Sequence, residues 1–138
     1  MTRALVDLNI ILDLLNKRKF HKDAARLFNL ADKGKIEAFV SAHEITTLSY
    51  FLEIQKKKKS EIRDILSNLL SILKIISTDK KILESALLSE INDYEDAVLE
   101  SAAIQYNVDY IITRNVKDFS KSKVPAVSPG VFLELESK

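Results

Sequence analysis

The sequence predicts an α/β protein, a three-layer α/β/α sandwich in which helices cover both faces of a central parallel sheet of four to five strands. Short runs of purely apolar residues alternate with longer segments whose apolar residues recur at helical spacing. Strands that are apolar throughout are typical of a sheet buried on both faces. The 138 residues are 46% hydrophobic and include only two Gly and two Pro. This composition favours regular elements around a real core, and we expect one domain over residues 1–138.

The first half of the chain begins with an apolar run that ends at Asp7, after which apolar residues recur at helical spacing. A later apolar stripe from Ala24 to Ala31 marks a second helix, and Gly34 is a typical helix stop. The expected elements are, in order, a strand at Ala4–Val6, a helix after Asp7, a helix from about His21 to Lys33, a strand at Ala38–Val40, a helix from about Ala42 to Gln55, and a helix that opens at Ser60 after the turn Lys56–Lys59.

The second half repeats this alternation, and its clearest strand is Tyr110–Thr113, in which an aromatic residue precedes three β-branched ones. The expected elements are a strand at Ile75–Ile76, a helix from about Asp79 to Leu88, a helix from Asp93 to Tyr106, the strand Tyr110–Thr113, a short strand at Val124–Val127, and a closing helix after Pro129. Strands separated by helices indicate parallel neighbours joined by helical crossovers.

Composition excludes several classes of protein. Lys and Arg number 21 against 20 Asp and Glu, so the net charge is +1. This overall charge does not by itself indicate a nucleic-acid partner, and binding of a nucleic acid would need local basic patches. The absence of Cys excludes disulfides and thiolate metal sites. No apolar stretch reaches the roughly 18 residues of a membrane span. We therefore expect a soluble, cytoplasmic protein without a membrane partner.

Polar side chains follow three of the predicted strands at the points where these strands end. Asp7 closes the first strand, Glu44 opens the helix after the second, and Asn115 and Asp118 follow the strand Tyr110–Thr113. Ligands of open parallel sheets bind beyond the carboxyl ends of the strands. We therefore expect these residues to gather at one edge of the sheet, where a charge that closes a buried strand, such as Asp7, has little structural use.

Two further observations predict a metal site there. Asp96 heads an apolar stripe formed by Leu99, Ala103 and Tyr106, and Glu44 shares a face with Leu48, Phe51 and Leu52. Carboxylates on core-facing stripes are costly unless they are paired or bound to metal, and two of them about 4 Å apart repel by roughly 4 kcal/mol at an effective dielectric of 20. Oxygen ligands without Cys or a well-placed His favour Mg²⁺ or Mn²⁺ over Zn²⁺.

Each candidate also has a purely structural interpretation. Asp93 and Asp96 fit an N-cap and an acid of the first helical turn, Glu44 fits the first turn of its own helix, and Asp118 fits a cap of the turn before Phe119. His21 and His43 are interpreted as solvated or capping residues at helix starts, and Asp13, Asp23 and Asp32 as surface charges. The run Lys56–Lys59 is interpreted as a solvated loop, with RNA contact as its alternative.

The segment Arg114–Lys123 contains four cations and Asp118, and it lies beside the proposed site. Because phosphate groups are steered by local positive charge, this segment is the better candidate for contact with a nucleic acid.

Three segments together resemble the PIN-domain family. Leu5–Leu15 is similar to the family's opening LVDTNVLLDLL, Asp93–Ala97 to its DFEDA helix start, and Tyr110–Phe119 to its YIITRNVKDF segment. The resemblance extends from Ala4 to the helix after Pro129. Each motif alone is modest, but the order and spacing of the three are specific.

The resemblance implies a Mg²⁺- or Mn²⁺-dependent endoribonuclease that cleaves single-stranded RNA and that is often the toxin of a toxin–antitoxin pair, like the VapC toxins. It also implies an antitoxin protein as partner and a homodimer. It carries the family's first acid over to Asp7 and its helix-start acid to Asp96, and the family's last catalytic position falls on Asn115, with Asp118 three residues on. Together with the helix-face argument for Glu44, we expect catalysis and metal binding at Asp7, Glu44 and Asp96, support from Asp93, Thr113 and Asp118, and substrate contact by Arg114 and Lys117.

Two positions depart from the family pattern. The family usually places Glu where this chain has Thr47, whereas Glu44 lies one turn earlier on the same face, about 5 Å along the helix axis. Asn115 stands where Asp is common. The departures favour an alternative function, a degraded PIN-like module that binds RNA or protein without cleavage. A phosphoryl-transfer or receiver-type domain is a third possibility, but it predicts an acid after Ile76, where the chain has Ser77 and Thr78.

Overall fold

The computed structural model describes residues 1–138 and contains a five-stranded sheet in the order β3-β2-β1-β4-β5, with every neighbouring pair parallel. The strands are β1 (Arg3–Val6), β2 (Glu37–Ser41), β3 (Lys74–Ile76), β4 (Tyr110–Ile112) and β5 (Ala126–Val127). The predicted parallel α/β architecture is therefore confirmed, and the sheet has the larger of the two strand numbers expected.

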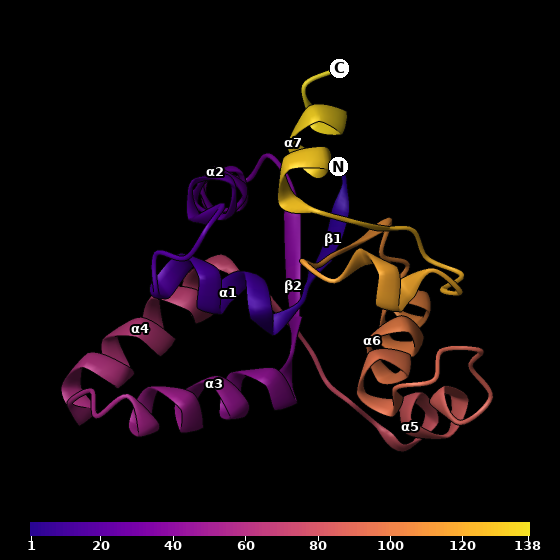
Figure 1. Ribbon diagram of the computed structural model, residues 1–138, viewed down its shortest axis with the longest axis horizontal. Coiled ribbons are helices and arrows are strands. Elements are labelled where there is room, and N and C mark those ends of the chain that lie inside the picture. Colours follow the sequence, from indigo (N-terminus) through magenta and orange to yellow (C-terminus); the bar gives the residue numbers. More distant parts are fainter.

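Helices cover both faces of this sheet (Figure 1). They are α1 (Leu8–Leu15), α2 (His21–Asp32), α3 (Ala42–Ile54), α4 (Lys59–Ile72), α5 (Lys80–Ala86), α6 (Tyr94–Gln105) and α7 (Pro129–Glu136). In β1, Ala4 and Val6 join the core beneath α1 to α4 and α7, whereas Leu5 joins the core beneath α5 and α6. The alternation of side chains along a strand thus fills two separate cores, which explains why the strands are apolar throughout.

The strand order creates a switch point between β1 and β4. The chain moves from β1 outward to β2 and β3, and then returns to the other side of β1 to form β4 and β5. Val6 pairs with Ile112, so Asp7 and Thr113 leave the sheet side by side, and the Asp7 backbone N–H donates to the Ile112 carbonyl at 2.9 Å. In sheets of this kind the crevice beyond such a reversal is where ligands bind.

Most predicted elements are found within a few residues of their expected bounds. The helix expected to reach Leu88 ends at Ala86, and the last strand contains only two residues. The segment after β4 forms a short 3-10 helix, η1 (Val116–Phe119), which includes Asp118. None of the helices is both long and apolar enough to cross a membrane.

Candidate functional site

A chain of hydrogen bonds holds the Asp7 carboxylate at the end of β1. Thr113 Oγ1 donates to Asp7 Oδ2 at 2.9 Å, and Asn9 Nδ2 donates to the same oxygen at 3.1 Å. Thr113 is fully buried, and its hydroxyl oxygen accepts from the backbone N–H of Asn115 at 3.1 Å. Because the hydroxyl of Thr113 both donates and accepts, the segment after β4 fixes the orientation of Asp7.

Glu44 reaches the same place from the first turn of α3. Glu44 is only 1% exposed, and its Oε2 accepts from the Leu8 backbone N–H at 3.0 Å. The other oxygen, Oε1, is buried without any hydrogen-bond partner. Burial, and then the charge of Asp7, raises the pKa of Glu44 to about 9, and burial also raises the pKa of Asp7. Without a cation, Glu44 is therefore protonated at neutral pH.

Asp96 lies at the start of α6, beside this pair. Its backbone N–H donates to Asp93 Oδ1 at 3.0 Å, so Asp93 is the N-cap that its structural interpretation predicted. Burial raises the pKa of the Asp96 side chain to about 7, and the charges of Asp93, Asp7 and Asp118 add to the shift. Asp96 also lines a cavity.

That cavity, of about 380 Å³, is lined by acidic and basic side chains that the sequence predicted near the site. Asp93 and Asp96 come from the start of α6, whereas Lys117 and Asp118 come from η1. We name it the acidic cavity. Lys117 thus lies where it could contact a bound phosphate group.

The donor set suits a hard divalent cation, although the side chains are not yet arranged around one. Asp7, Glu44 and Asp96 do not converge as a group of three metal ligands in this structure. The unpartnered Oε1 of Glu44, buried beside a second carboxyl group, is nevertheless the kind of atom that a cation or a proton must satisfy. His43 lies elsewhere, with Nδ1 at 3.4 Å from Thr78 Oγ1, which leaves oxygen ligands of the Mg²⁺ type.

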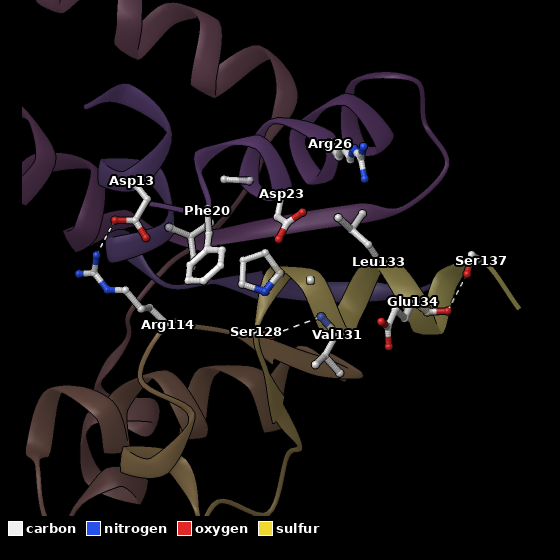
Figure 2. Close-up of a pocket in the computed structure, with 14 residues that line it drawn as sticks. Asp13, Phe20, Asp23, Arg26, Arg114, Ser128, Val131, Leu133, Glu134 and Ser137 are labelled. Atoms are coloured by element: carbon white, nitrogen blue, oxygen red, sulfur yellow. Dashed lines mark hydrogen bonds and ion pairs between the residues drawn. The ribbon is translucent and has the colours of Figure 1, made fainter. Parts of the chain in front are cut away.

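Arg114 is directed away from the acidic cavity. Its side chain forms an ion pair with Asp13 at one end of a different pocket, of about 680 Å³, between α1, α2 and α7 (Figure 2). Its backbone N–H donates to Asn9 Oδ1 at 3.3 Å. In this conformation Arg114 therefore ties α1 to the segment after β4, and its predicted contact with substrate stays a prediction.

The interpretation of Asp13 as a surface charge is wrong. Asp13 is 4% exposed, and its carboxylate also lies 3.8 Å from the guanidinium of Arg18. Asn9 and Asp13 are one helical turn apart, so both point from α1 toward the segment after β4. The spacing of Asn9 and Asp13 in the sequence was the available signal, but it did not identify the partner 101 residues away.

In helix α3, Thr47 occupies the position at which the resemblance to PIN domains would place a glutamate. Thr47 Oγ1 donates to the His43 carbonyl at 3.0 Å, so its hydroxyl proton is already hydrogen-bonded within its own helix. Leu48 and Leu52 are fully buried as expected, whereas Phe51 is 37% exposed. The buried acid of this helix is therefore Glu44.

The comparisons with known proteins agree with this geometry. The model of the PIN-domain family matches residues 3–117. The chain belongs to the PIN-domain family. Members of this family are generally nucleases. Comparison with curated protein sequences gives no significant match.

Solved structures with the same fold include toxin–antitoxin complexes. The VapBC2 complex of Rickettsia felis, bound to a promoter DNA fragment, has a chain with 22% identity and a TM-score of 0.71, covering 91% of this PIN domain and 97% of that chain. A toxin–antitoxin complex from Klebsiella pneumoniae has 23% identity, a TM-score of 0.68, and coverage of 91% and 97%. VapC20 of Mycobacterium tuberculosis, a toxin that cleaves the Sarcin–Ricin loop, has 14% identity, a TM-score of 0.61, and coverage of 78% and 86%.

Proposed function

We propose that this PIN domain is a Mg²⁺- or Mn²⁺-dependent endoribonuclease that cleaves single-stranded RNA. The observation that carries the proposal is the pairing of the buried Glu44 with the half-buried Asp7 at the switch point of the sheet, which leaves Glu44 Oε1 without a hydrogen-bond partner. Two adjacent carboxyl groups removed from water are costly unless a proton or a bound cation neutralises one of them, and such pairs are typical of functional sites.

In the proposed mechanism Asp7 and Asp96 hold the cation, and Glu44 either binds it or orients a water molecule. The bound cation would lower the pKa of that water and stabilise negative charge on the attacked phosphate. Thr113 and Asn9 keep Asp7 in one orientation through their hydrogen bonds. Lys117 lines the acidic cavity and would offset the charge that develops on the phosphate, and Asn115 would position water or a phosphate oxygen.

We further propose that the protein is the toxin of a toxin–antitoxin pair, acts in the cytoplasm, and forms a homodimer. The similarity to chains of toxin–antitoxin complexes supports an antitoxin partner. Tyr50, Phe51 and Ile54 are exposed on α3 and offer an apolar surface for a second copy. Light scattering of the purified protein tests the dimer, and a Tyr50→Lys, Ile54→Lys variant that remains dimeric would exclude this surface.

The second candidate is a PIN-like module that binds RNA or protein without cleaving RNA. It is favoured by the Thr47 hydroxyl, which is already satisfied inside α3, and by the lack of three convergent metal ligands. This module would retain the fold and any surface contacts but would bind no catalytic cation.

Cleavage of a labelled single-stranded RNA with Mn²⁺ distinguishes the two candidates. Asp7→Asn and Asp96→Asn should each reduce the rate at least about 100-fold, since even outer partners of metal ligands contribute 10- to 100-fold. Asp32→Asn, an exposed acid at the end of α2, is the matched control and should cleave normally. Cleavage that persists in both site variants would exclude the proposed site. Failure of the unaltered protein both to cleave RNA and to bind Mn²⁺ would favour the binding module.

A further inference from the structure

A second cavity adjoins the acidic cavity on the α5–α6 side of the molecule. It has a volume of about 570 Å³ and is lined by residues of α5, α6, the connection between them, and the segment after η1. Glu90 and Lys121 line both cavities. The two hollows are thus neighbouring parts of one surface depression, and we name the second one the lysine cavity.

Three cations converge on the lysine cavity from distant parts of the chain. Lys81 comes from α5, and Lys121 and Lys123 come from the segment after η1. All three are exposed, and none of them forms an ion pair. Ser85 and Ser101 add hydroxyl groups to the wall. Glu90 and Glu100 also line this cavity, so its three lysines exceed its acids by one. Unpaired ammonium groups together with hydroxyl donors are suited to phosphate oxygens.

A buried carboxylate holds the lysine-bearing segment in place. Glu100 is 4% exposed, its Oε1 accepts from Ser89 Oγ at 2.5 Å, and its Oε2 accepts from the backbone N–H of Lys123 at 2.7 Å. Both of its oxygens are therefore engaged within the protein. Glu100 fixes the backbone of Lys123 against α6, so the lysines belong to an ordered wall of the cavity.

We propose that the lysine cavity binds the phosphodiester backbone of the RNA strand next to the bond that is cleaved. The inference rests on the proposed ribonuclease function and adds the path of the substrate. The acidic cavity has four acids, Glu90, Asp93, Asp96 and Asp118, against Lys117 and Lys121, so it repels phosphate groups, and the protein carries a net charge of only +1. A polyanion can be held beside those acids only where local cations outweigh them, and Lys121 supplies one at the boundary of the two cavities.

The chain offers a matched control in the lysines of the α3–α4 turn. Lys56, Lys58 and Lys59 are also exposed and also form no ion pair. In Figure 1 this turn lies at the opposite end of the molecule from α5 and α6. Replacing three lysines by Gln in either group changes the net charge equally, from +1 to −2, so that only the position of the lost charges differs.

The test measures binding of a fluorescein-labelled single-stranded RNA by anisotropy at several salt concentrations. It uses the full chain with Mg²⁺ and with Asp7→Asn in every variant, so that the RNA stays intact. Each lost phosphate contact should reduce the slope of log affinity against log salt by about 0.7. The variant Lys81→Gln, Lys121→Gln, Lys123→Gln should therefore reduce the slope by about 2, and the variant of the α3–α4 turn by less than about 0.7.

Equal slopes in the two triple variants, or a larger loss in the variant of the α3–α4 turn, would overturn the proposed path. A parallel cleavage assay with Asp7 intact separates this outcome from failure of the proposed function. If the chain cleaves RNA and the lysine-cavity variant keeps an unchanged KM, the path is wrong and the nuclease stands. If RNA binding depends on the three lysines and no variant cleaves, the path stands and the nuclease is wrong. No binding of RNA by the chain would overturn both.

Discussion

Glu44 and Glu100 are both buried glutamates on core-facing helices, yet they have opposite roles. Glu100 accepts hydrogen bonds on both oxygens, from Ser89 and from the backbone of Lys123. Glu44 has one such bond, an unpartnered oxygen, and the Asp7 carboxyl group beside it. Burial of an acid therefore does not identify a functional residue. A buried acid with a carboxyl oxygen that lacks a hydrogen-bond partner is the better indicator of a functional residue, because only a ligand or a proton can supply that partner.

The largest expected difference between Glu44 and Glu100 is in the stability that Mn²⁺ adds to variants of each residue. A cation that binds only the folded protein adds about 2.7 kcal/mol to the free energy of unfolding at 100 times its Kd. We expect this gain in thermal unfolding of the unaltered protein and of Glu100→Gln, and little of it in Glu44→Gln. An equal gain in both variants would remove Glu44 from the metal site.

Without metal, the same two substitutions should change stability in opposite directions at pH 8. Glu44→Gln replaces a carboxyl group that takes up a proton on folding by an amide of similar shape that is neutral in both states, and it should raise the free energy of unfolding by about 2 kcal/mol. Glu100→Gln leaves one donor without its acceptor and should lower it by about 1–3 kcal/mol. Urea denaturation measures both, and a loss of stability in Glu44→Gln would contradict the comparison.

The pH dependence of stability should carry the signature of Glu44. Its pKa is about 9 in the folded, metal-free protein and has an ordinary value of 4.5. Between these values the unfolded chain has released the proton that the folded protein retains, so stability falls as the pH rises, by up to about 1.4 kcal/mol per unit. Urea titrations from pH 5 to 9 should show this fall, and Glu44→Gln should make it shallower. A slope that is identical in Glu44→Gln would contradict the raised pKa.

Asp13→Asn tests a third buried acid, and we expect it to have the smallest effect on the free energy of unfolding. Asp13 is paired with Arg114 and Arg18, whose side chains are 44% and 45% exposed and can turn toward water. The expected loss of stability is therefore only about 1 kcal/mol. Asp32→Asn, the exposed control, should stay within about 0.5 kcal/mol of the unaltered protein. A loss of several kcal/mol in Asp13→Asn would mean that the arginines cannot be solvated.

The order of strands and helices could be predicted from the sequence because it depends on local periodicity. The apolar runs at β1 and β4 and the helical stripe after Asp96 specify an element and the face that it buries. The rule for open parallel sheets then predicted that Asp7 and Glu44 lie at one edge of the sheet, and Asp96 was predicted from the apolar stripe that it heads. The resemblance to PIN domains, given by three motifs, is shown by the match over residues 3–117.

The partners of the buried charges could not be predicted in this way, because periodicity identifies a face and not the residue that packs against it. Asp13 was expected at the surface, yet its partner Arg114 is 101 residues away. Glu100 lay on a helix recognised from the sequence, but its contacts with Ser89 and Lys123 depend on how α6 packs against two loops. The lysine cavity could not be predicted for the same reason, because Lys81 and Lys123 line one cavity only when the chain has folded.

Asp7, Glu44 and Asp96 illustrate the division between sequence and tertiary structure. The sequence by itself determined their positions at a strand end and at two helix starts. Tertiary packing decided that Glu44 is the one left with a buried, unpartnered oxygen beside Asp7. The physical reason is that desolvation and hydrogen bonding act between neighbours in space, and these neighbours are brought together only when α1, α3 and the end of β4 pack at the edge of the sheet.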